Sequence, residues 1–301
     1  MDEFYIILTG ALVAISCGLT GCYLILRRMA MIGDAISHAV LPGIVIAFLL
    51  TGTIQSLPML IGAGLVGVLS TMLIEFIHRK AKVQTDAAIG ITFTFLFAVG
   101  IILISAFASN VDIDQDCILF GEIAFIPLDT TEIFPGFEVP LAVLTLSFTL
   151  LVNIAFITLG YKQLFITTFD PAYASAIGIS ASVWHYLLMG AVSFTTVASF
   201  EAVGAILVVA FLVAPPATAY LLTESFKTML ALTVLFGIIA SAAGYALATA
   251  INGSIAGAMT TVAGALFLAA FIFTLIKKRN RTQITEVIDK PDLTESLKAE
   301  A

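Results

Sequence analysis

Long runs without charged residues constrain the fold of this 301-residue chain more than any other feature. A helix needs about twenty apolar residues to cross a hydrocarbon core about 30 Å thick. Nine runs reach or approach this length: 4–26, 31–52, 57–77, 87–107, 139–160, 184–200, 202–222, 229–250 and 255–276. The first run is too long for a cleavable signal and follows Asp2 and Glu3 instead of basic residues. We therefore predict an all-α, polytopic membrane bundle of nine spans.

The composition agrees with this prediction. Hydrophobic residues make up 60% of the chain and charged residues 11%, whereas about a quarter of the residues of a soluble domain are charged. A soluble enzyme is therefore excluded. The net charge of −7 also argues against a basic surface for nucleic acid, so we expect no nucleic-acid partner.

The basic residues predict the orientation, because Lys and Arg are retained on the cytoplasmic side of bacterial membranes. With nine spans and the N-terminus outside, all thirteen lie on the cytoplasmic side: Arg27, Arg28, Arg79, Lys80, Lys82, Lys162, Lys227, Lys277, Lys278, Arg279, Arg281, Lys290 and Lys298. The outside segments carry only acidic charge, at Asp2, Glu3 and in the 108–138 loop. We expect a multi-pass protein of a bacterial cell membrane with a cytoplasmic C-terminus.

Two parts of this map admit alternatives. The 184–222 stretch is too long for one helix. Its one interruption lies around Ser199, Phe200 and Glu201, where we place the turn, with a turn elsewhere in the stretch as the alternative. The 31–52 segment opens with polar residues, so a partly re-entrant element is the alternative to a full span. An eight-span chain would move one terminus to the other side and spoil the charge distribution, which favours nine.

The predicted spans form one transmembrane domain over residues 1–276, followed by a polar cytoplasmic tail over 277–301. Small residues recur within the spans, and their spacing allows helices to pack backbone to backbone. They include Gly62, Gly64, Gly67, Gly253, Gly257 and Gly264. The three cysteines, Cys17, Cys22 and Cys117, are interpreted as small packing residues.

The richest polar sequence inside a predicted span is Gly33-Asp34-Ala35-Ile36-Ser37-His38-Ala39-Val40-Leu41-Pro42-Gly43. Asp34 and His38 are four residues apart, so on a helix they share one face and can reach one ion. A carboxylate with an imidazole suits Mn²⁺, Fe²⁺ or Zn²⁺. Pro42 has no amide hydrogen, which frees the carbonyl of residue 38 as a third oxygen. The alternative is that Asp34 caps the helix and His38 bonds a neighbouring carbonyl.

Ionisable side chains inside a membrane segment indicate function, because burying each costs about 3 kcal/mol or more. Glu201 is a second candidate metal ligand on this ground, since it is the only Asp, Glu, Lys or Arg between residues 171 and 223. The interpretation that we favour for Glu201 is a surface turn near the outer interface.

A short helix is predicted within the 161–183 loop. Asp170 is a good N-cap, Pro171 suits the first helical position, and Gly178 can take the left-handed conformation that ends a helix. Seven residues are too few for a stable isolated helix. We expect this helix to dock either on a partner ATPase or on its own bundle.

The sequence lacks the common signatures of ATP binding and hydrolysis. It contains no Gly-x-x-x-x-Gly-Lys-Ser/Thr phosphate loop, no His-Glu-x-x-His pair and no Gly-x-Ser-x-Gly elbow. We predict that the chain is not an enzyme and that any energy source is a separate protein.

The sequence from Gly33 to Gly43 resembles the signature of the permeases of bacterial ABC importers for zinc, manganese and iron. Further similarity covers about residues 5–276, in Asp86-Ala87-Ala88-Ile89-Gly90, Phe169 to Gly178, Val203 to Val208 and Ala214 to Ala219. The loop from Asp112 to Glu122 is most similar to the manganese and iron members. Pro215-Pro216 departs from the single proline that is more usual in the family.

This resemblance implies a permease that works as a dimer, of two copies or with a related chain. It implies cytoplasmic ATPase subunits and an extracytoplasmic metal-binding protein or lipoprotein as partners. Asp34 and His38 would contact the ion, which is the substrate and the only metal implied, with no permanently bound cofactor. The coupling helix that receives the ATPase movement would comprise Asp170, Pro171, Ala172, Tyr173, Ala174 and Gly178.

We therefore expect alternating-access import of a divalent metal. Mn²⁺ is preferred to Zn²⁺ or Fe²⁺ because the ligands are rich in oxygen and lack cysteine. An incomplete ligand set also suits a site that must release its ion. The alternative is an ATP-independent secondary carrier or channel, in which Asp34 and His38 relay protons or gate cations. A metal enzyme would need an open three-ligand site, and only two ligands are credible.

Overall fold

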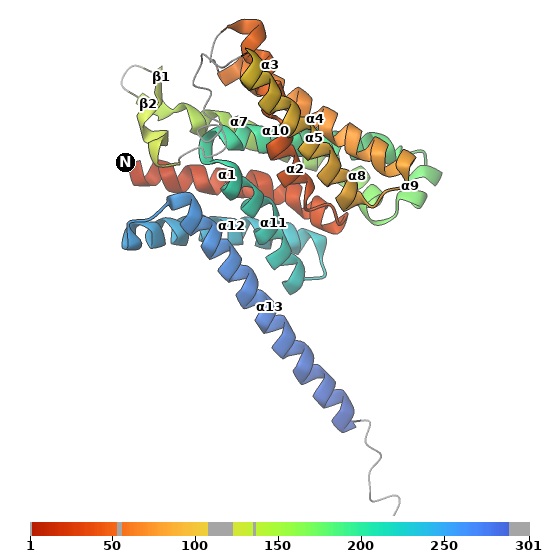
Figure 1. The fold of residues 1–301 in the computed structure, drawn as a ribbon. Coiled ribbons are helices and arrows are strands. Elements are labelled where there is room, and N and C mark those ends of the chain that lie inside the picture. The colour runs from red at the N-terminus through yellow and green to blue at the C-terminus, as the bar shows by residue number, and fades with distance from the viewer. Residues whose placement is uncertain (1, 53–55, 108–122, 135–136, 289–301) are drawn as a thin grey trace, which may run out of the picture.

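The computed structural model describes residues 2–52, 56–107, 123–134 and 137–288, and Figure 1 shows them as a helical bundle with a small hairpin. The elements in chain order are α1 (Asp2–Leu26), α2 (Ile32–Ala39), α3 (Leu41–Thr51), α4 (Ser56–Ala81), α5 (Thr85–Phe107), η1 (Ile123–Leu128), β1 (Thr130–Phe134), β2 (Phe137–Pro140), α7 (Leu141–Leu159), α8 (Tyr161–Phe169), α9 (Pro171–Ala176), α10 (Ala181–Val203), α11 (Ala205–Leu222), α12 (Phe226–Ile251) and α13 (Ile255–Ile288).

The number of membrane spans is confirmed. Within the described residues, nine helical segments are long and apolar enough to cross a membrane, and each end lies within three residues of its predicted position. The second of these segments, Ile32–Thr51, consists of α2 and α3 together. The all-α bundle that the uncharged runs predict is therefore the fold of the chain.

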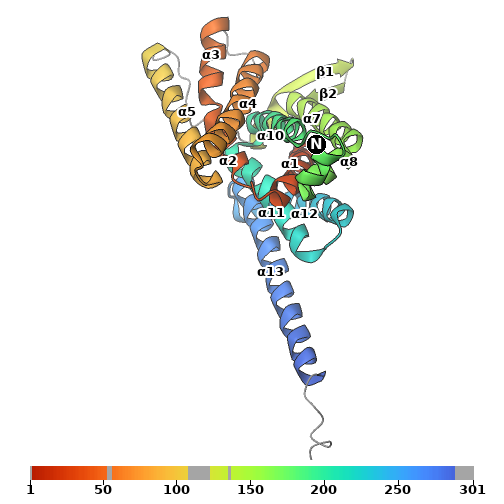
Figure 2. The same cartoon turned by 90° about the vertical axis from the view of Figure 1, so that its right-hand side faces the viewer.

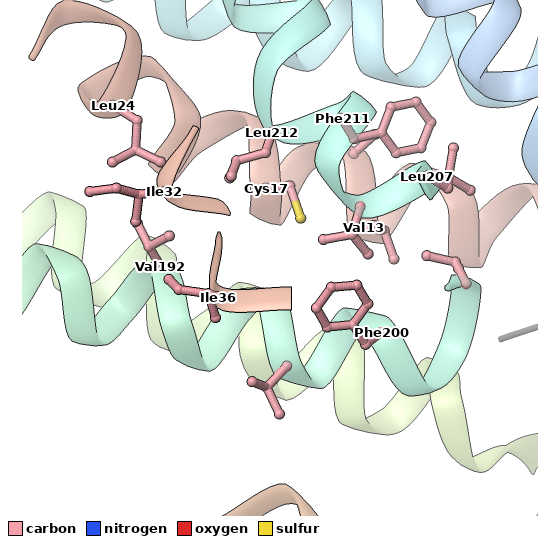
Figure 3. Packing of buried hydrophobic residues seen from close by; sticks show 14 of the residues in the cluster. Val13, Cys17, Leu24, Ile32, Ile36, Val192, Phe200, Leu207, Phe211 and Leu212 are labelled. Carbon is pink, nitrogen blue, oxygen red and sulfur yellow. The ribbon is translucent and has the colours of Figure 1, made fainter. Parts of the chain in front are cut away.

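Helix α1 lies at the centre of the bundle, where it packs against α7, α10, α11 and α12. Figure 3 shows the apolar side chains that fill the contacts between α1, α2, α10 and α11. They include Val13, Cys17, Leu24, Ile32, Ile36, Val192, Phe200, Leu207, Phe211 and Leu212, all of them buried. Helices α3, α4 and α5 pack on one another and spread out on one side of α10, as Figure 2 shows. Helix α2 therefore lies between the central core and this outer group.

The second span is broken in the middle. Val40 caps the C-terminal end of α2 and the N-terminal end of α3, and Pro42 lies in the first turn of α3. Because Pro42 has no amide hydrogen, the carbonyl of His38 loses its usual helical partner. The sequence predicted the freed carbonyl but not the division of the span into two helices, which directly follows the helix that carries Asp34 and His38.

The predicted turn between the sixth and seventh spans is misplaced. Helix α10 continues through Ser199, Phe200 and Glu201 to Val203, and the break occurs at Gly204 with φ +77°. A glycine adopts this conformation without the clash that a Cβ atom would cause. The conformational freedom of Gly204 ends the helix, whereas the charge of Glu201 does not.

Three regions contain more regular structure than the sequence predicted. Helix α8 occupies the first part of the 161–183 loop, and β1 and β2 form an antiparallel hairpin within the outer loop. Helix α13 continues past the predicted boundary at residue 277 to Ile288, so the described part of the tail is helical, and Figure 1 shows it projecting from the bundle. Residues 108–122, with Cys117 and the acidic Asp112 to Glu122 segment, lie outside the described residues.

Glycines allow close helix contacts at some of the predicted positions. A Cβ atom on Gly62 would overlap the carbonyl oxygen of Gly43, and one on Gly43 would overlap the carbonyl oxygen of Gly62, so α3 and α4 meet backbone to backbone. Gly67 faces Ser193 in the same close manner. By contrast, a Cβ atom on Gly64 would meet nothing within 4 Å. The recurrence of small residues therefore predicted the contact but not all of its members.

Candidate functional site

Asp34 lies in the first turn of α2, where the positive end of the helix dipole favours a carboxylate. The N-cap position belongs to Met31, which makes no side-chain cap bond. Asp34 therefore does not occupy the capping position that the alternative interpretation required. The Ser37 hydroxyl donates to the backbone carbonyl of Asp34, which leaves the Asp34 carboxylate available on the face that it shares with His38.

The carboxylate of Asp34 and the imidazole of His38 face each other one turn apart. Asp34 Oδ1 lies 3.7 Å from His38 Nε2, and the side chains are 37% and 36% exposed. Two metal bonds of about 2.1 Å at a tetrahedral angle would place their donor atoms roughly 3.4 Å apart. The pair can therefore hold one ion with little movement, and its exposed side leaves room for further ligands.

Packing fixes the orientation of the His38 ring. The ring centroid lies 5.9 Å from that of Phe93 and 5.8 Å from that of Phe97, both on α5. On the opposite face of α2, Ile32 and Ile36 are buried against the core. A helix held on both sides presents its two donor groups in a fixed geometry, which is what a metal site requires.

Glu201 is not part of this arrangement. It is exposed near the C-terminal end of α10. Among the described residues, no group of three or more His, Cys, Asp or Glu side chains is close enough to hold a metal ion, so Glu201 is not brought together with Asp34 and His38. Its assignment as a metal ligand gains no support from the geometry.

The predicted short helix is present as α9. Asp170 is its N-cap and accepts a hydrogen bond at Oδ1 from the Tyr173 amide at 2.9 Å, and Pro171 is its first residue. Gly178 has φ +83°, and the Ile179 amide donates to the Ala174 carbonyl at 2.9 Å. The helix spans six residues, one fewer than predicted. Its caps are those that the sequence indicated.

Most of the surface of α9 is uncovered. Ala174 is the one residue of the helix that is buried, and Tyr173 is 55% exposed. The main contacts of α9 within the described chain are with α8 and α10. Within the described chain, the helix therefore offers more surface than it buries, which favours docking on a partner over resting on its own bundle.

Sequence reasoning missed a second polar group, which joins Arg27, Glu75 and His185. Arg27 follows α1, Glu75 lies near the end of α4, and His185 lies near the start of α10. Each residue falls at the predicted cytoplasmic end of its span. This shared position is the feature of the sequence that could have indicated the group. Burial of the Arg27 guanidinium lowers its pKa.

A model of the ABC 3 transport family matches residues 4–274. The manganese transport system membrane protein MntD of Bacillus subtilis is 48% identical over 285 residues, which cover 93% of this chain and 96% of that protein. The zinc transport system membrane protein TroD of Treponema pallidum is 40% identical over 269 residues, which cover 89% of this chain and 73% of that protein.

A solved structure has a similar fold. The structure of PsaBC from Streptococcus pneumoniae in complex with Fab superposes with a TM-score of 0.72 and 35% sequence identity. The match covers 89% of this chain and 90% of the chain in that structure. The likeness therefore extends over all but a small part of the bundle.

Proposed function

Because the chain belongs to the ABC 3 transport family, we propose that it carries Mn²⁺ in preference to other divalent metals. The chain is a multi-pass membrane permease of a bacterial ABC importer. Its relatives include proteins named for manganese and for zinc transport. The higher identity to the manganese protein, 48% against 40%, supports Mn²⁺ as the first choice.

The Asp34–His38 pair is the observation that carries the proposal. It offers one carboxylate oxygen and one imidazole nitrogen on a broken span, a donor set that suits a divalent first-row metal. Two protein ligands form an incomplete shell, so water or a second permease chain supplies the remainder. An incomplete shell binds an ion weakly enough to release it during each transport cycle.

The Asp34–His38 pair offers oxygen and nitrogen donors and no sulfur. The two described cysteines lie elsewhere, with Cys17 Sγ 3.8 Å from the Ser199 hydroxyl and Cys22 Sγ 3.2 Å from the Thr233 hydroxyl. Thiolate ligands would favour Zn²⁺, whereas carboxylate, carbonyl and water oxygens suit Mn²⁺. The lack of thiolate ligands at the pair supports Mn²⁺ over Zn²⁺. Fe²⁺ ranks between these two metals in our proposal.

The energy source is a separate ATPase that docks on α9. The capped and exposed helix supplies the surface, and the sequence contains no phosphate loop of its own. The orientation follows the positive-inside bias, with α9 on the cytoplasmic side and an extracytoplasmic binding protein delivering the ion from the acidic side. Tyr5 donates to the Glu138 carbonyl at 3.3 Å, which brings the acidic N-terminus beside the outer hairpin.

Metal uptake by cells that carry His38→Ala tests this function. We expect Mn²⁺ accumulation to fall at least about tenfold, since even loss of an outer partner of a metal ligand costs that much. Ser37→Ala is the control, because it alters a neighbouring buried residue of α2 and leaves both donor side chains in place. Normal Mn²⁺ accumulation by His38→Ala at normal membrane levels would overturn the site assignment.

A further inference from the structure

A partly buried polar network joins four segments at the basic end of the bundle. The three nitrogens of the Arg27 guanidinium each have a contact: Nε donates to Thr168 Oγ1 at 3.1 Å, Nη2 donates to Thr167 Oγ1 at 3.2 Å, and Nη1 lies 3.2 Å from His185 Nδ1. His185 Nε2 in turn lies 3.5 Å from Glu75 Oε2. Segments distant in sequence are thereby linked side chain to side chain.

The chemistry of arginine fixes the direction of these contacts. A guanidinium has only donors, so His185 Nδ1 accepts from Arg27. The single proton of the neutral imidazole is then on Nε2, the ring atom that lies 3.5 Å from Glu75 Oε2. His185 therefore lies in contact with both Arg27 and Glu75. If Arg27 moves away, the contact that holds the His185 proton on Nε2 is lost.

Burial gives the network more influence than a surface ion pair would have. The Glu75 side chain is 9% exposed and the His185 side chain 18% exposed. Exposed ion pairs contribute little because water screens them, whereas buried charged groups depend on their hydrogen bonds. Movement of one member therefore has a large effect on the others.

A cavity of about 560 Å³ adjoins the network. Arg27, Glu75 and His185 line it, together with Ile32 at the start of α2 and Pro171 at the start of α9. The cavity therefore touches both the helix that carries Asp34 and His38 and the proposed coupling helix. This position between the two helices is where we expect an ion that leaves the Asp34–His38 pair towards the basic end of the bundle to pass.

Short segments of the chain connect this network to α9 and to α2. Thr168 is three residues before Pro171, so displacement of α9 also displaces the hydroxyls that hold Arg27. On the other side, Arg27 is five residues before Ile32, and the linker is tightly folded, with Arg28 in the left-handed region at φ 59°. Arg27 is thus placed to communicate between α9 and the start of α2.

We propose that Arg27, His185 and Glu75 form a latch at the cytoplasmic end of the ion pathway, and that Arg27 is the positioning residue that links this latch to the coupling helix. The proposal rests on the proposed function, because it assumes an ATPase acting on α9. Movement of α8 and α9 withdraws the Thr167 and Thr168 hydroxyls from Arg27. The guanidinium then releases His185, and α10 and α4 separate to open the cavity.

The test measures metal uptake and ATP hydrolysis in the same vesicles, which hold the permease assembled with its ATPase. Arg27→Gln keeps a polar side chain but removes the guanidinium, whose three nitrogens make the contacts. We expect uptake per ATP hydrolysed to fall about tenfold, the effect of losing one charge-assisted hydrogen bond, while ATP hydrolysis continues. Lys80→Gln is the matched control, because it removes the same charge from an exposed residue near the end of α4 that does not line the cavity and should leave the ratio unchanged.

Two further variants separate positioning from general stability. Arg27→Lys restores the charge without the planar fork, so we expect only partial recovery of the ratio. His185→Gln tests the second half of the latch and should lower the ratio as Arg27→Gln does. An unchanged ratio in Arg27→Gln, or a proportional loss of uptake and ATP hydrolysis, would overturn the latch. Absence of metal uptake by the unaltered complex would instead refute the proposed function.

Discussion

The Asp34 carboxylate lies 3.7 Å from the His38 imidazole, one turn apart on a short helix that ends at Ala39. The short helix keeps the two donors one turn apart, while the tilted contact with Phe93 and the edge-to-face contact with Phe97 hold the His38 ring. The structure thus presents a pre-arranged pair of ligands with an open side, which is suited to passing an ion onward.

Metal binding should stabilise the purified permease through this pair. A ligand at one hundred times its dissociation constant adds about 2.7 kcal/mol to the free energy of unfolding. We expect Mn²⁺ to raise the melting temperature of the unaltered protein, and Asp34→Asn to lose this increase because the amide lacks the negative charge. Thermal melting with increasing Mn²⁺ provides the measurement.

Asp170→Asn is the control for that experiment, since it makes the same chemical change at the N-cap of α9 and Asn caps as well as Asp. Its response to Mn²⁺ should match that of the unaltered protein. An undiminished shift in Asp34→Asn would show that Mn²⁺ binds elsewhere.

Loss of the cap should weaken α9, the proposed coupling helix. Asp170→Ala removes the acceptor for the Tyr173 amide, which costs about 1 kcal/mol of helix stability. We expect less ATPase to copurify with the permease and a lower rate of metal uptake, while Asp170→Asn retains both. Equal ATPase recovery and uptake for Asp170→Ala and the unaltered protein would argue against α9 as the docking element.

The close contact between α3 and α4 should tolerate no side chain at Gly62. A Cβ atom there would overlap the Gly43 carbonyl oxygen and lie 2.8 Å from the Ala47 Cβ atom, and such overpacking costs about 1–3 kcal/mol. Gly62→Ala should therefore lower the melting temperature in detergent. Gly64→Ala, two residues away and facing open space, should leave it nearly unchanged, and equal melting of the two variants would contradict the packing.

Much of the fold was predictable because hydrophobic length and charge are local properties of the sequence. The nine spans and the caps at Asp170 and Gly178 follow from such local signals, as does the carbonyl of residue 38 that Pro42 leaves without a helical partner. The predicted position of the turn after the sixth span was wrong. The prediction relied on the charge of Glu201, whereas the backbone conformation of Gly204 ends the helix. Helix α8 was missed because its polar first turn, with Lys162 and Gln163, is typical of a loop.

The candidate site was predictable only where its members share one helix. Asp34 and His38 are four residues apart, so helical geometry alone places them together. Arg27, Glu75 and His185 are separated by many residues, and only the packing of α1, α4 and α10 brings them into contact. The orientation rule places all three at one side of the membrane but cannot predict which neighbours meet there.

The account is tested most directly by transport in vesicles that contain the permease and its ATPase, with ATP inside and the metal-binding protein outside. We expect Mn²⁺ to accumulate only when both ATP and the binding protein are present, and Asp34→Asn combined with His38→Ala to abolish accumulation. Accumulation without ATP would contradict the account and identify a secondary carrier or channel. Accumulation by the double variant at the unaltered rate would show that the ion does not pass through the Asp34–His38 pair.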